Sequence, residues 1–134
     1  MLARLLAIAL VTFSAGTAAA KECWALSGFK GQTAVSINKW EFSPDGFSNP
    51  MILCFNDDAT GSVTGDDAPL TKFGFSTLLG FAQNGGMELS ESYQIDRKAG
   101  TVLFIKSRIG TPTVLPRGPD IVGAFVGKAT RLPQ

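Results

Sequence analysis

Short runs of alternating apolar and polar residues, separated by turn-forming residues, recur along most of this 134-residue chain. A period of two is the pattern of a β-strand with one buried face, and short strands at even spacing are typical of an all-β barrel or sandwich. We expect strands at residues 23–29, 34–42, 47–55, 59–65, 70–81, 87–95, 101–109 and 125–132. The predicted fold is all-β, an antiparallel up-and-down meander of about eight strands that closes into a small barrel or sandwich.

The residues between these segments predict how the strands pair. Residues 43–46 read Ser-Pro-Asp-Gly, in which Pro presets φ and Gly permits a reversal, so a hairpin between 34–42 and 47–55 is expected. Asn84-Gly85 is a strong hairpin signal before residues 87–95. The last segment, 125–132, is expected to pair with the first strand and remove the open edges.

The loop at residues 96–100 decides the register of the next hairpin. A three-residue loop with Gly100 in the left-handed conformation sets Glu91 opposite Ser107 and gathers the apolar residues on one face. A four-residue loop sets Glu91 opposite Lys106 and mixes polar with apolar positions. The three-residue loop is the prediction.

A proline-rich stretch follows at residues 111–119. Pro112, Pro116 and Pro119 exclude a central strand, so we expect a semi-rigid surface loop there. A single helical turn capped by Asp120 is possible after it, near the C-terminus.

The first twenty residues have the layout of a secretory signal peptide. Arg4 precedes an apolar run at residues 5–13, and Ala18 and Ala20 form an A-x-A arrangement. The run is shorter than the ~20 residues of a membrane span. We therefore expect cleavage after Ala20, a single β domain over residues 21–134, a periplasmic or extracellular location, and no stable membrane insertion.

The two cysteines, Cys23 and Cys54, are expected to form a disulfide in such an oxidising compartment. Closing a loop of about 32 residues stabilises a fold by roughly 3 to 4 kcal/mol on the chain-entropy model. The chain contains no histidine, which excludes histidine-assisted nucleophiles and most zinc and iron sites.

The charge balance argues against nucleic acid as a partner. Removal of residues 1–20 takes away Arg4, one of 12 basic residues, and no acid, which leaves 11 basic against 11 acidic residues. A nucleic-acid-binding protein typically carries a clustered basic surplus, and none is visible here.

Two aspartate pairs are weak candidates for a cation site. Asp57 and Asp58 precede a stretch rich in Gly, Thr and Ser, and Asp66 and Asp67 follow it. Neither pair has the spacing of a calcium loop, and Asp side chains in tight turns commonly bond the backbone two residues on. We predict two turns, with neither a metal nor another cofactor.

Four residues are candidates for contact with a ligand or partner. Glu91 is either a carboxylate inside the barrel or at its mouth, or an acid at the rim that bonds Ser107, Lys106 or another basic side chain. Trp40 and Tyr93 could line a pocket, although such aromatics more often fill a core. Arg117 lies in the proline-rich loop, which could insert into a partner's cleft or serve only as a spacer.

The function predicted from these features is that of a small exported binding module without enzymatic activity, such as an inhibitor or a carrier, for an unknown protein or small ligand. One alternative is a carboxylate-dependent hydrolase that uses Glu91 with Glu41, Asp57 or Asp66, since two acids within ~5 to 10 Å can hydrolyse a glycoside. Another is a structural component of the cell envelope.

Overall fold

The computed structural model describes residues 21–65, 70–110 and 118–134, and antiparallel strands account for most of them. The strands are β1 (Glu22–Val35), β2 (Ser43–Phe47), β3 (Met51–Phe55), β4 (Thr60–Val63), β5 (Leu70–Phe73), β6 (Thr77–Asn84), β7 (Met87–Asp96), β8 (Thr101–Ile109) and β9 (Ile121–Arg131). The one helical element in these residues is a 3-10 turn, η1 (Ser36–Asn38).

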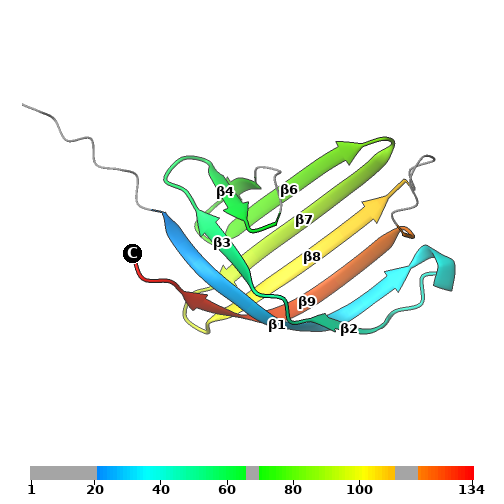
Figure 1. Ribbon diagram of the computed structural model, residues 1–134, viewed down its shortest axis with the longest axis horizontal. Coiled ribbons are helices and arrows are strands. Elements are labelled where there is room, and N and C mark those ends of the chain that lie inside the picture. Colours follow the sequence, from blue (N-terminus) through cyan, green and yellow to red (C-terminus); the bar gives the residue numbers. More distant parts are fainter. Residues whose placement is uncertain (1–20, 66–69, 111–117) are drawn as a thin grey trace, which may run out of the picture.

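Eight of the strands form a closed barrel (Figure 1). β1 and β3 to β9 pair in sequence, each antiparallel to the next, and β9 returns to pair with β1. Closure of the first strand on the last leaves β1 and β9 without an open edge between them. The predicted all-β antiparallel fold and its closing pair are confirmed, and of the barrel and the sandwich expected the structure has the barrel.

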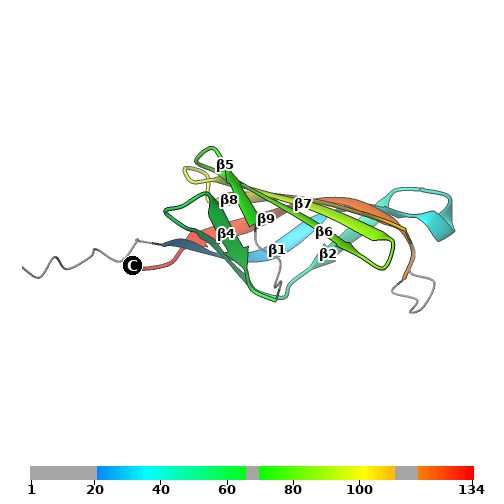
Figure 2. The same cartoon turned by 90° about the horizontal axis from the view of Figure 1, so that it is seen from above.

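β1 is long enough to pair with two strands along the same edge. Its first part pairs with β3, where Cys23 lies opposite Cys54, and its second part pairs with β2, where Gly31 lies opposite Asp45. β3, β4 and β5 are short. Along β6, the pairing with β5 covers residues 77–79 and no more of the strand. The barrel is therefore closed at one end only, which we call the closed half. At the other end, which we call the open half, the strands spread into the sheet β6-β7-β8-β9-β1-β2 (Figures 1 and 2).

The prediction of a hairpin turn at residues 43–46 was wrong. These residues lie inside β2, opposite residues 30–33 of β1, and the chain reverses earlier, at residues 36–42. Within β2, Asp45 accepts a hydrogen bond from the Thr33 hydroxyl (3.2 Å) and one from the Gly46 amide (2.7 Å). The Asp side chain thus supports pairing between strands, where the sequence suggested a turn.

The single strand expected at 70–81 is two strands. β5 ends at Phe73, the chain turns through residues 74–76, and β6 begins at Thr77. Gly74 has φ +66°, the left-handed conformation that a glycine adopts without steric cost. The alternation continues through the turn, so the pattern alone does not reveal it.

The predicted register of β7 and β8 was also wrong. Glu91 lies opposite Lys106, and Asp96 opposite Thr101, which is the four-residue loop. Asp96 Oδ1 accepts hydrogen bonds from the amides of Lys98 and Ala99, and its carbonyl accepts one from the Gly100 amide. This network closes the longer loop.

The helical turn considered after the proline-rich loop is not formed at Asp120. That residue directly precedes β9, and its carbonyl accepts a hydrogen bond from the Ser36 amide at 3.0 Å. The expected loop itself falls mostly on residues 111–117, outside the described residues.

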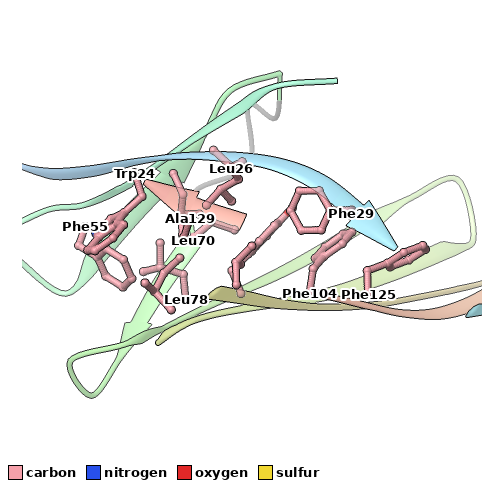
Figure 3. Close-up of a cluster of buried hydrophobic side chains, with 14 residues drawn as sticks. Trp24, Leu26, Phe29, Phe55, Leu70, Leu78, Phe104, Phe125 and Ala129 are labelled. Atoms are coloured by element: carbon pink, nitrogen blue, oxygen red, sulfur yellow. The ribbon is translucent and has the colours of Figure 1, made fainter. Parts of the chain in front are cut away.

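Aromatic and aliphatic side chains fill the interior (Figure 3). The buried cluster comprises Trp24, Leu26, Phe29, Leu53, Phe55, Val63, Leu70, Leu78, Tyr93, Ile95, Val102, Phe104, Phe125 and Ala129. Phe29 stacks on Phe47 with ring centroids 4.5 Å apart, and Tyr93 stacks on Phe104 at 4.6 Å. Such ring pairs add about 0.5 to 1.5 kcal/mol beyond their burial.

The predicted disulfide is confirmed. Cys23 and Cys54 are bonded, and they lie directly opposite each other on the paired strands β1 and β3, with Cα atoms 4.1 Å apart.

Candidate functional site

Residues 36–42, which connect β1 to β2, form a turn that we call the aromatic turn. After η1, Lys39 has φ +54° and Trp40 has φ +62°. The left-handed region is unfavourable for residues with a Cβ, at roughly 1 to 2 kcal/mol each. Two such residues in succession indicate that the rest of the turn determines their conformation.

Backbone hydrogen bonds hold the aromatic turn in this shape. The Lys39 amide donates to the Ser36 carbonyl, the Trp40 amide to the Val35 carbonyl, and the Glu41 amide to the Asn38 carbonyl, at 3.1 to 3.2 Å. The bond from the Ser36 amide to Asp120 ties the turn to the start of β9. The turn is therefore an ordered part of the fold.

Three apolar side chains of the aromatic turn are exposed. Ile37 is 75% exposed, Phe42 61% and Trp40 46%. Ile37 and Phe42 line a surface hollow together with Asn38, Lys39, Glu41 and Ser43. The interpretation of Trp40 as a core residue was wrong, because β1 ends at Val35 and the apolar residues beyond it leave the sheet.

Sequence reasoning missed Ile37 and Phe42 as surface residues. Phe42 continues an apparent alternation with Asn38 and Trp40, and this favoured a strand through residue 42, with Ile37 on its opposite face. The one available signal was Asn38, a residue type that is common in turns.

Glu91 lies half-buried on the inner face of the sheet, at the start of the open half. It stands between Gly80 of β6 and Lys106 of β8, and the Tyr93 hydroxyl donates a hydrogen bond to its Oε2 at 3.1 Å. Tyr93 itself is buried against Phe104. Tyr93 is thus a core residue whose hydroxyl points to the carboxylate.

Other charged side chains lie on the same inner face. The Lys106 ammonium lies 5.8 Å from the centre of the Phe125 ring, and Arg108 donates to the Pro119 carbonyl at 2.9 Å. Across the sheet, Asp45 accepts from Thr33. The open half therefore presents mixed charges, whereas the closed half contains apolar side chains.

Two of the acids considered as catalytic partners of Glu91 lie in exposed turns. Glu41 is exposed in the aromatic turn, and Asp57 is exposed in the turn between β3 and β4. Asp66, like Asp67 and Arg117, lies outside the described residues.

The first aspartate pair forms a turn, as predicted. Asp58 Oδ1 accepts hydrogen bonds from the hydroxyl and the amide of Thr60, the amide bond measuring 2.9 Å. These bonds, the hydroxyl bond foremost, lower the pKa of the Asp58 carboxyl. Among the residues that the structure describes, no group of three or more His, Cys, Asp or Glu side chains is arranged to hold a metal ion.

Comparison of the chain with models of protein families, with curated proteins and with solved structures gave no match. In residues 21–65, 70–110 and 118–134, no helix has the length and apolar character needed to cross a membrane. The aromatic turn and the inner face around Glu91 are thus the two candidate sites that the geometry itself provides.

Proposed function

We propose that this chain is a binding protein without catalytic activity, which recognises a folded protein partner through the aromatic turn. The observation that carries the proposal is the exposure of Ile37, Trp40 and Phe42 on an ordered turn that contains two left-handed residues. Strained backbone of this kind persists where the surrounding structure determines it, and it clusters at functional sites. Exposed aromatic side chains on a rigid support are typical of the anchors that dominate binding energy.

A protein partner is favoured over a small ligand carried inside the barrel. Stacked rings such as Phe29, Phe47, Phe104 and Tyr93 occupy the interior where a carrier would need space. The aromatic turn instead projects at the end of the open half (Figure 1). An apolar pocket on the partner would accept these side chains, with polar groups at its rim for Lys39 and Glu41.

The chemistry of the chain supports a role without catalysis. It has no histidine, and both cysteines are bonded to each other. The disulfide is consistent with an oxidising compartment. With the signal-like residues 1–20, it supports the proposal that the protein acts in the periplasm or outside the cell.

The test is affinity capture from an envelope extract with the purified protein as bait, followed by measurement of the dissociation constant for the captured partner. Trp40→Ala and Phe42→Ala are expected to weaken binding about tenfold or more each, as for central aromatic anchors. Phe75→Ala is the matched control, because Phe75 is a more exposed aromatic residue in a different turn, between β5 and β6.

Equal binding by the wild type and the Trp40→Ala, Phe42→Ala double variant would overturn the proposal. So would equal losses in the Phe75 control, since they would indicate general adhesion of exposed rings. Thermal unfolding of each variant establishes that the fold is retained.

A further inference from the structure

The outer face of the sheet β6 to β9 carries apolar side chains where a barrel in water usually carries polar ones. Phe81 is 70% exposed, Ile109 54% and Ile105 51%. The outward apolar residues of this surface, which we call the outer sheet face, are Leu79, Phe81, Leu103, Ile105, Ile109, Val122, Ala124 and Val126. A contiguous apolar surface of this kind marks an interaction site.

The outer sheet face has relief that another surface can fill. Between the apolar side chains of β6 and β8, the outward residues of β7 are the small Ser90 and Ser92. A shallow hollow runs along them, lined also by Phe81 and Ile105. The Ser90 hydroxyl is hydrogen-bonded to that of Ser107 at 2.7 Å, so these two polar groups satisfy each other.

At one end of the outer sheet face, two side chains of opposite charge lie on either side of β8. The register places Asp96 of β7, Thr101 of β8 and Lys128 of β9 side by side in one row across the sheet. An acid and a base therefore flank an uncharged central strand.

We propose that the outer sheet face binds the same face of a second copy of this chain, with a two-fold axis along β8. This axis exchanges β7 with β9, so Asp96 of each copy faces Lys128 of the other, and two ion pairs form. In an isologous contact, residues on the axis meet their own copies. The outward residues of β8 suit that position, because Thr101, Leu103, Ile105, Ser107 and Ile109 are all uncharged.

The same operation matches shape as well as charge. Ser90 and Ser92 of β7 come to lie against Val122 and Ala124 of β9, Gln94 comes to lie against Val126, and Phe81 lies toward Val122. Each sheet is twisted, so the two faces diverge away from the contact centre. A contact centred on Leu103 and Ile105 therefore leaves out Glu88, the acid at the far end of β7.

The test is the mass of the purified protein in solution, measured by sedimentation velocity over a range of concentrations. The wild type is expected to dimerise. Ile105→Lys places two ammonium groups together on the axis, and we expect the dimer dissociation constant to rise about a hundredfold or more. Ile52→Lys is the matched control, since Ile52 of β3 is similarly exposed, 41% against 51%, but lies outside this face.

A charge exchange tests the orientation of the two copies. Lys128→Glu converts both expected attractions into repulsions, and the dissociation constant should rise about tenfold. Adding Asp96→Asn should restore part of the affinity, because the repulsion is removed while an amide oxygen can still accept the Lys98 and Ala99 hydrogen bonds.

A wild-type protein that stays monomeric at all concentrations overturns the proposal. A dimer that tolerates Ile105→Lys, or one in which Asp96→Asn does not improve the Lys128→Glu variant, also overturns it. Circular dichroism of each variant shows whether the barrel is intact. These outcomes are independent of partner capture by the aromatic turn.

Discussion

At the scale of single residues, Arg97 connects several elements at the closed end of the barrel. It lies in the turn between β7 and β8 and contacts β1, β3 and the turn between β5 and β6. It forms an ion pair with Glu22 of β1 at 2.8 Å, donates to the Phe75 carbonyl and the Ser76 hydroxyl, and lies over the Phe55 ring. The hydrogen bond from Arg97 is the main cause that lowers the pKa of the Glu22 carboxyl below 4.5. The pair is partly exposed, so its contribution to stability is modest.

Glu22→Gln should lower the free energy of unfolding by about 0.5 to 1 kcal/mol at pH 7. A carboxyl whose pKa is depressed in the folded state stabilises the fold above its unfolded pKa, and this contribution is lost as the pH falls through the folded value. The difference between wild type and variant should therefore shrink below pH 4.5. Urea unfolding at pH 7 and at pH 3 measures it.

The control is Glu88→Gln, which alters an exposed acid of β7. A Glu22→Gln difference that is the same at both pH values, or no larger than that of the control at pH 7, would contradict the assignment of stability to this pair.

Some residue-scale features could be read from the sequence and others could not. The pairing of Cys23 with Cys54 followed from their number, and the turn at Asp58 followed from the short reach of its side chain. The exposure of Trp40 could not be predicted, because it depends on where β1 ends. Two backbone hydrogen bonds determine that end: the Ser36 amide donates to the Asp120 carbonyl, and the Trp40 amide donates to the Val35 carbonyl.

At the scale of elements, the alternation located the strands better than their partners. β7 and β8 lie where they were predicted, yet their register differs by one residue. The cause is that β8 is apolar on both faces, with Val102 and Phe104 inside and Leu103 and Ile105 outside. A pattern that is apolar on both faces cannot identify the buried one, and the outer apolar residues are those of the proposed dimer contact.

The close pairing of β1 with β9 depends on a glycine. A Cβ at Gly31 would lie 1.9 Å from the Ala124 carbonyl oxygen and 2.8 Å from the Phe125 Cα, both backbone atoms. Gly31→Ala should therefore destabilise the protein by about 3 kcal/mol or more, at the upper end of overpacking effects. Chemical denaturation followed by tryptophan fluorescence measures this loss.

Gly74→Ala tests the cost of a left-handed backbone conformation without steric crowding of the added Cβ. Gly74 has φ +66° but nothing within 4 Å of the added Cβ, so its substitution should cost only about 1 kcal/mol. Equal losses at the two positions would mean that β1 and β9 can move apart at little cost.

At the scale of the whole molecule, closure of the barrel was predictable and its division into halves was not. The even spacing of strands and the apolar final segment indicated a closed antiparallel sheet. The open half arises because β3, β4 and β5 are only four or five residues long beside strands of eight to fourteen. Turn chemistry at 43–46 and the unbroken alternation at 70–81 concealed those lengths.

The disulfide stabilises the closed half. Replacement of Cys23 and Cys54 by Ser should lower the free energy of unfolding by roughly 3 to 4 kcal/mol, from the entropy of the opened loop in the unfolded chain. Guanidinium unfolding of the variant and of the reduced wild type should give similar losses. A loss below about 1 kcal/mol would contradict this role, since it lies under the usual range for such a loop.

The pairing of β1 with β9 also affects when the protein can fold during its synthesis. Within the barrel, β1 is synthesised before the other strands and β9 after them, so the seam between β1 and β9 stays open until residue 131 has left the ribosome. Contacts between such distant segments slow folding. A nascent or C-terminally truncated chain would present the backbone of β1 and β8 to other chains, and would depend on chaperones or rapid proteolysis to avoid aggregation.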